Sequence, residues 1–78
     1  MKGLYLGHNK ITEIPTEIGN LLKLERLEID NNQLREFPLS LTNLTNLQEL
    51  HFYNNFLITL AKEIQDFIQF KRLKLNDD

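Results

Sequence analysis

The sequence repeats one apolar pattern with a period of 23 residues. The copy from Leu24 to Leu34 has apolar residues at its first, fourth, sixth and eleventh positions and an asparagine at its ninth. The same columns hold Met1, Leu4, Leu6, Asn9 and Ile11 one period earlier, and Leu47, Leu50, Phe52, Asn55 and Leu57 one period later. A period of this length predicts a coil of stacked supersecondary units, because one unit alone cannot bury its apolar side.

This repeat accounts for the whole chain without an insertion. It divides the 78 residues into units 1–23, 24–46 and 47–69 and a partial unit 70–78. Further apolar columns hold Ile14, Phe37 and Leu60; Ile18, Leu41 and Ile64; and Leu21, Leu44 and Phe67. A chain of this length forms one domain at most. We expect a single repeat domain over residues 1–78.

Each unit predicts a strand followed by a return path of another kind. Short parallel strands are expected near residues 3–7, 26–30, 49–53 and 72–76, with side chains pointing inwards and outwards alternately. Pro15, Pro38 and Ala61 begin the return path, where proline fits the first turn of a helix. Apolar residues then recur three apart, so single helical or 3-10 turns are predicted at 16–21, 39–44 and 62–67.

The asparagines of the ninth column, Asn9, Asn32 and Asn55, are interpreted as structural. An amide inside the coil both donates to and accepts from the backbone of adjacent turns. It thereby satisfies groups that the bend after each strand leaves unpaired.

The pattern L-x-x-L-x-L-x-x-N-x-L followed by x-x-[I/F]-P-x-x-[I/L] resembles the short leucine-rich repeats of bacterial proteins and of the intracellular Ras-binding group. The resemblance covers the entire chain. It implies an α/β solenoid, a short right-handed coil with a parallel β-sheet on its concave face and helical or 3-10 turns on its convex face. It also implies a non-catalytic module whose variable concave residues bind a protein or peptide partner.

The two ends depart from that family pattern, which normally includes terminal caps. Met1 stands at the first position of a unit, and the last unit stops after Phe70, Leu73 and Leu75. An uncapped stack exposes one apolar layer at each end. We therefore expect a homo-oligomer formed through the uncapped ends, or a truncated fragment of a longer repeat protein.

Composition argues against several classes of partner. The formal net charge is -2, with nine basic and eleven acidic residues spread singly, so no basic face is expected to bind nucleic acid. Cysteine is absent, which excludes disulfides and thiolate chemistry. No signal peptide or membrane span is visible, and the cytoplasm is the default location.

Catalysis and cofactors are not expected. Ser40 is the sole serine and falls on the predicted convex side, away from both histidines, so a nucleophile and a base cannot meet. No glycine-rich phosphate loop occurs among the three glycines. A metal at His51 with Glu28 and Asp30, or at an inter-chain His8, stays open, although a Glu–His surface pair is the simpler interpretation.

Outward-facing columns supply the candidate binding residues. In the 23-residue frame, Arg26, Glu49 and Arg72 form a cross-strand charge ladder, and Lys74 stands beside His51. Aromatic side chains contribute large contact area at low entropic cost. The predicted partner-binding set is Tyr5, Glu28, Asp30, His51, Tyr53, Phe56 and Lys74. The alternative function is a structural self-assembling unit whose main partner is another copy of itself.

Overall fold

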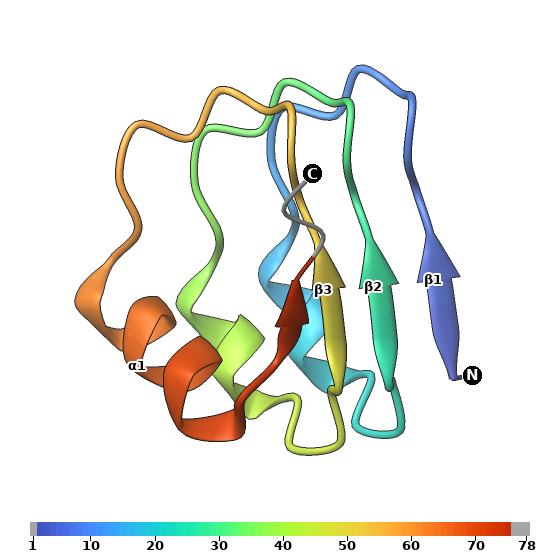
Figure 1. Ribbon diagram of the computed structural model, residues 1–78. Helices are drawn as coiled ribbons and strands as arrows, with labels where there is room; N and C mark the ends of the chain where they lie inside the picture. The colour runs from blue at the N-terminus through green and yellow to red at the C-terminus, as the bar shows by residue number, and fades with distance from the viewer. Residues whose placement is uncertain (1, 76–78) are drawn as a thin grey trace.

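The computed structural model describes residues 2–75 and shows a coil with strands along one side and helical segments along the other (Figure 1). Met1 and residues 76–78, including the predicted end of the last unit, lie outside the described part. The elements in chain order are β1 (Gly3–Tyr5), η1 (Thr16–Asn20), β2 (Arg26–Glu28), η2 (Leu39–Asn43), β3 (Glu49–His51), α1 (Lys62–Lys71) and β4 (Lys74–Leu75), where η denotes a 3-10 helix.

All four strands form one parallel sheet in the order β1-β2-β3-β4. Leu4 pairs with Leu27, and Leu27 pairs with Leu50, so the first three strands keep the 23-residue offset of the sequence. The predicted α/β solenoid with a parallel sheet is therefore confirmed. Proline precedes both 3-10 helices, as expected, in an extended conformation that ends the connection from the strand.

The prediction of a single helical turn at 62–67 in the third unit is wrong. Its helix α1 has 10 residues and continues to Lys71. The segment contains no glycine or threonine, whereas η1 contains Gly19 and η2 contains Thr42, both weak helix formers. Arg72 ends α1 with a left-handed φ of 54°.

The longer helix shifts the pairing of the last strand. Lys74 lies opposite Glu49 and Leu75 opposite Leu50, an offset of 25 rather than 23 residues. The predicted ladder ending at Arg72, and the position of Lys74 beside His51, are therefore wrong. Phe70, expected in the core, is 90% exposed, and Leu73 is buried. A shift of two residues preserves the alternation along a strand, so leucines still face the core.

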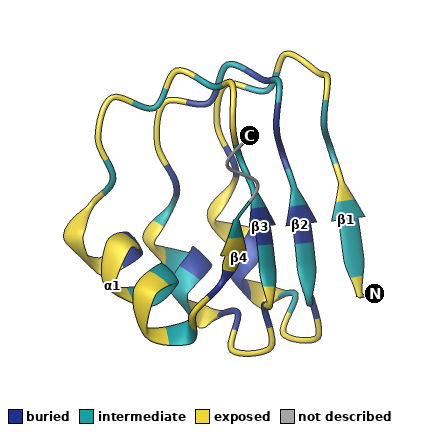
Figure 2. Cartoon of the chain, in the orientation of Figure 1, coloured by how far each residue is buried: buried dark blue, intermediate teal, exposed yellow. Residues whose placement is uncertain are grey.

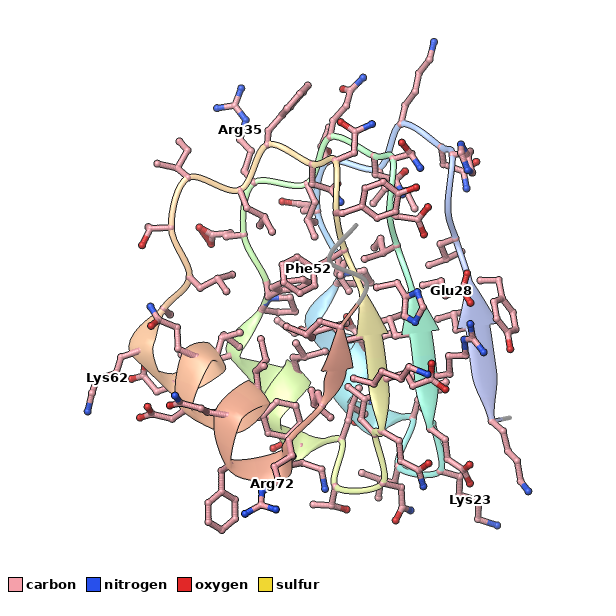
Figure 3. The ribbon with its side chains drawn as sticks, viewed as in Figure 1. Lys23, Glu28, Arg35, Phe52, Lys62 and Arg72 are labelled. Atoms are coloured by element: carbon pink, nitrogen blue, oxygen red, sulfur yellow. The ribbon has the colours of Figure 1, made fainter. Side chains whose placement is uncertain are left out.

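Burial is deepest in the middle of the coil. Leu27 and Leu50 are completely buried, whereas Leu4 in the first strand is only partly covered (Figure 2). Phe52 packs edge-to-face against Phe37 with ring centroids 5.4 Å apart, inside the coil (Figure 3). The partly buried apolar side chains of the two outer layers are Leu4, Leu6, Ile11 and Leu21 at one end and Phe52, Leu57, Leu60, Phe67, Ile68 and Leu75 at the other.

Asparagine side chains connect consecutive turns. The Asn32 amide nitrogen donates to Leu6 O at 2.9 Å and to Ile29 O at 3.0 Å, while its oxygen accepts from Ile11 N at 3.0 Å. Asn55 repeats this arrangement one turn later, with bonds to Ile29 O, Phe52 O and Leu34 N. The amide of Asn9 donates to carbonyls of its own turn.

Candidate binding surface

The outer face of the sheet carries the side chains that alternate with the core leucines. We call this surface the sheet face. It consists of Gly3, Tyr5, Arg26, Glu28, Asp30, Glu49, His51, Tyr53 and Lys74. Glu28 projects from β2 on this side (Figure 3). Because β2 and β3 are paired on both sides, the side chains between the core leucines stand on a rigid base.

Arg26 is the charged centre of the sheet face. Its Nε lies 2.7 Å from Glu28 Oε2, and its Nη1 lies 3.8 Å from Glu49 Oε2. The buried Nε–H does not point at an acceptor, so the short contact is an ion pair without a hydrogen bond. The guanidinium also lies 5.9 Å from the centroid of the Tyr5 ring, within cation–π range. These contacts hold Arg26 between two carboxylates and an aromatic ring.

The Tyr5 ring lies in space that is free because Gly3 has no side chain. A Cβ at Gly3 would lie 2.5 Å from the Tyr5 hydroxyl and 2.7 Å from its Cζ, so the ring occupies the space above the glycine. The side chain is nevertheless 63% exposed. An aromatic ring that is positioned by its neighbours and still open to solvent is typical of a binding anchor.

Beyond the strands, a second polar row crosses the sheet at the bend. His8, Asn31 and Asn54 share the eighth column and have φ values of 59°, 57° and 57°, in the left-handed region. Asn54 donates to Asn31 Oδ1, and the Asn31 amide donates to Asp30 Oδ2 at 2.9 Å and approaches the Tyr53 hydroxyl at 3.4 Å. The row therefore contacts Asp30 and Tyr53 at one edge of the sheet face and helps to position them.

The histidines have carboxylates nearby but no common site. His51 Nε2 lies 3.3 Å from Glu49 Oε1, and His8 Nε2 lies 3.9 Å from Asp30 Oδ2. Within residues 2–75, no group of three or more histidine, cysteine, aspartate or glutamate side chains could hold a metal ion. His51 pairs with Glu49 rather than with the predicted Glu28 and Asp30.

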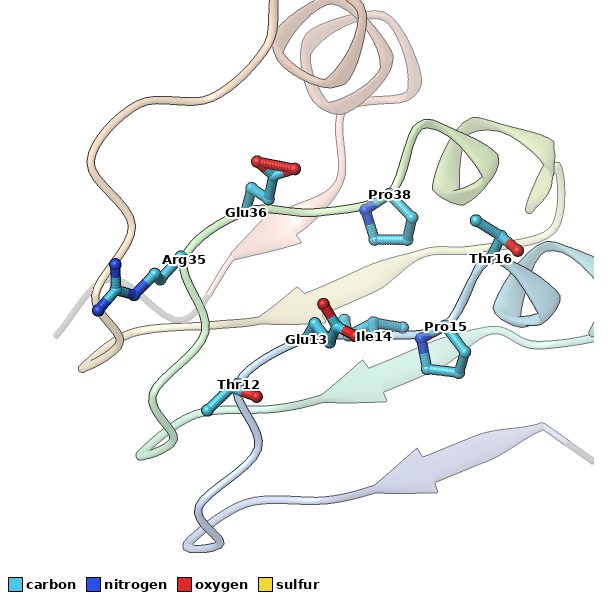
Figure 4. Close-up of a pocket in the computed structure, with 8 residues that line it drawn as sticks. All are labelled: Thr12, Glu13, Ile14, Pro15, Thr16, Arg35, Glu36 and Pro38. Atoms are coloured by element: carbon cyan, nitrogen blue, oxygen red, sulfur yellow. The ribbon is translucent and has the colours of Figure 1, made fainter.

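A groove of about 630 Å³ lies away from the sheet face, between the connections that follow β1 and β2 (Figure 4). Its lining residues are Thr12, Glu13, Ile14, Pro15, Thr16, Arg35, Glu36 and Pro38. None of them belongs to the sheet face. The groove and the sheet face are thus separate surfaces of the coil.

A sequence profile described as "Leucine Rich repeats (2 copies)" matches residues 1–41, more than half of the chain. The chain belongs to the leucine-rich repeat family.

This leucine-rich repeat chain is similar in structure to a leucine-rich repeat protein of Leptospira interrogans. The two share 33% sequence identity and superpose with a TM-score of 0.78. The match covers 97% of this chain and 19% of the Leptospira chain, so the chain spans about a fifth of that protein's length. No curated protein sequence matches the chain.

The family has a general activity that is known only at a coarse level. Leucine-rich repeats are non-enzymatic repeat modules that generally mediate protein–protein interaction. In the part of the chain that the structure describes, no helix is both long and apolar enough to span a membrane.

The structure separates the predicted partner-binding residues into groups. Tyr5, Glu28, His51 and Tyr53 stand together on the sheet face, and Asp30 lies among them but is only 8% exposed. Lys74 belongs to the same face, opposite Glu49. Phe56 follows the bend at residues 54–55 and therefore lies on the connection out of β3 rather than on the strand.

Sequence reasoning left Arg26, Glu49 and Asn31 out of the predicted set, although all three organise this region. Arg26 and Glu49 were visible as a charge ladder, but their contacts with Tyr5 and His51 depend on side-chain rotamers. The asparagine pairs at 31–32 and 54–55 are the sequence feature that indicates a special backbone position for Asn31. Asparagine is several-fold enriched at positive φ, which the first residue of each pair adopts.

Proposed function

We propose that this leucine-rich repeat domain binds a protein or peptide partner on its sheet face. Tyr5, His51 and Tyr53 supply the contact area, and Glu28, Asp30 and Lys74 supply charges around it. Phe56 lies at the border of this surface. The observation that carries the proposal is the Tyr5 ring, which is held over Gly3 beside Arg26 and is still mostly exposed.

The physical support comes from preorganisation. Binding energy at protein interfaces is concentrated in a few aromatic and arginine side chains. Ordering a side chain on binding costs about 0.5–1.5 kcal/mol, which Tyr5 and Arg26 largely avoid because their neighbours already position them. The salt bridges of Arg26 are partly exposed, so each contributes on the order of 1 kcal/mol or less and mainly fixes geometry.

A library of random 12-residue peptides, displayed on phage and selected against the wild-type chain, tests this proposal. We expect at least one class of selected peptides to shift the backbone amide NMR signals of β1, β2 and β3. Tyr5→Ala and Tyr53→Ala should each weaken their affinity about tenfold or more. Glu63→Ala, on the exposed side of α1, is the matched control and should leave the affinity unchanged. A selection in which every class of peptide binds both tyrosine variants as tightly as the wild type would contradict the assignment.

A second candidate function is self-assembly. It is favoured by the outer layers, where Leu4, Leu6 and Ile11 are only half-buried, whereas their equivalents in the second unit, Leu27, Ile29 and Leu34, are completely buried. A second copy stacked on an end would cover such a layer. Sedimentation equilibrium over a concentration series separates the candidates, because a monomer at several hundred micromolar excludes self-assembly as the main activity.

A further inference from the structure

The segments that lead from each strand to the following helix form a side of the coil distinct from the sheet face. We call residues 10–15, 33–38 and 56–61 the flank. Backbone hydrogen bonds join neighbouring segments, from Gln33 N to Ile11 O and from Phe56 N to Leu34 O, both at 2.9 Å. The flank is therefore a continuous surface along the first three units (Figure 1).

The third segment of the flank is apolar where the other two are polar. Ile58 is 86% exposed, and its column holds Thr12 and Arg35 in the earlier units. Phe56 is 57% exposed, in a column with Lys10 and Gln33. A single exposed apolar residue is ordinary in a folded protein. Phe56 and Ile58 are two such residues in one segment, on either side of the core residue Leu57, and we call them the apolar patch.

Ile58 is exposed because of its position in the repeat, and not because it belongs to the last complete unit of the stack. Thr12 and Arg35 are both exposed, although each belongs to a unit that a following unit covers. A further turn of the coil stacked on the third unit would cover core columns such as Leu57 and leave the column of Ile58 open. A unit stacked on the third one would therefore leave Ile58 exposed to solvent.

The groove of about 630 Å³, which lies on the flank between the first two units, carries unbalanced charge. Glu13 and Glu36 line it from neighbouring segments, and Arg35 is the one cation among its lining residues. Arg35 extends away from both carboxylates (Figure 4). Among residues 2–75, neither glutamate forms an ion pair. The groove is thus complementary to a positively charged group.

We propose that the flank is a second interaction surface, which binds a protein segment carrying an apolar side chain and a basic side chain. The apolar side chain packs on Ile58 and the neighbouring Phe56, and the basic side chain enters the groove beside Glu13 and Glu36. Charge complementarity selects this partner over an acidic or phosphorylated segment. The flank adjoins the sheet face at Phe56, but its proposed partner does not depend on the function proposed for the sheet face.

The same displayed library of random 12-residue peptides tests the proposal, with selection now repeated on variants. Ile58→Thr places on the third unit the residue that the first unit has in that column, and Glu13→Gln with Glu36→Gln removes both carboxylates at constant size. On the wild type we expect a class of peptides enriched in one apolar and one lysine or arginine residue. Its affinity should fall about tenfold on each variant and remain unchanged on Tyr53→Ala.

NMR shifts identify the surface that these peptides occupy. They should affect amides of residues 10–15, 33–38 and 56–61 more than those of β1 and β2. Equal affinity for the wild type and both flank variants, or shifts confined to the strands, would overturn the proposal. Sedimentation equilibrium tests whether a second copy of the chain occupies the flank. A wild-type dimer that Ile58→Thr converts to a monomer would show that it does, and would also overturn the proposal. Circular dichroism of each variant verifies that the fold is retained.

Discussion

At the scale of single residues, Gly3 and Gly19 have different roles, which depend on the atoms that fill the space next to each glycine. The space above Gly3 is filled by the far end of a flexible side chain, the Tyr5 ring. The space above Gly19 is filled by a backbone oxygen of Ser40, at 2.7 Å from an added Cβ, which cannot rotate away. Gly3 therefore positions a binding candidate, and Gly19 permits close packing.

Gly3→Ala should displace the Tyr5 ring without unfolding the chain. The ring can rotate away, so we expect the free energy of unfolding to change by less than about 1 kcal/mol. Contacts between the Tyr5 ring and the Arg26 guanidinium, 5.9 Å away, should disappear from NOE spectra. If those NOEs persist at wild-type strength, Gly3 does not place the ring.

Asn32 is a buried polar residue whose amide cannot be replaced by a carboxylate. Its Nδ2 faces the carbonyls of Leu6 and Ile29, so Asn32→Asp places an acceptor against acceptors. We expect a loss of roughly 3 kcal/mol, measured by urea denaturation. Asn9→Asp is the control, because the exposed Asn9 amide contacts carbonyls of its own turn, and it should lose less than about 1 kcal/mol. Equal unfolding midpoints for the two variants would refute the inter-turn role.

At the scale of elements, the packing of η1 against η2 depends on side-chain size. Ser40 Oγ donates to Thr16 O at 2.7 Å, which draws the two 3-10 helices together over Gly19. Helix α1 takes the same place in the third unit with three turns, and the two additional residues before β4 follow from it.

Gly19→Ala should destabilise the chain although alanine is the better helix former. The added Cβ would clash with backbone, so overpacking costs about 2 kcal/mol and outweighs the gain in helix propensity of about 1 kcal/mol. Thr42→Ala, in the same column of the second unit, is the matched comparison and should stay within about 1 kcal/mol of the wild type. Thermal unfolding followed by circular dichroism measures both, and a Gly19→Ala variant more stable than the wild type would rule out the clash.

At the scale of the whole molecule, stability is unevenly distributed along the coil axis. Strands β2 and β3 have a neighbour on each side, whereas β1 has a single neighbour. Side chains in the middle layer are completely buried, and those of the outer layers are partly exposed. In a stack whose units contact only adjacent units, opening begins where a neighbour is missing.

Amide hydrogen exchange should reveal this gradient. We expect the amides of Leu27 and Ile29 to exchange about tenfold more slowly, or slower still, than that of Leu6, because opening β1 exposes fewer buried contacts. The Leu6 amide is a fair comparison, since it is hydrogen-bonded to Glu28 O at 2.8 Å. Uniform protection across the three strands would instead mean that the coil opens as one cooperative unit.

The coil follows from the repeat pattern alone, because a 23-residue period of leucine and asparagine leaves no other way to bury each apolar layer. The repeat pattern also determined the pairing of the first three strands and which side chains face outwards, since alternation follows directly from strand geometry.

The pairing of β4 could be read only from the folded chain, because the length of α1 depends on packing and helix propensity together. No column of the repeat predicts that length. The tertiary structure likewise decided the partners of Arg26 and His51. Periodicity assigns a residue to a face, but contacts between long side chains depend on rotamers, which neighbouring strands select. The exposure of Ile58 likewise follows only from the folded coil, in which its column faces solvent.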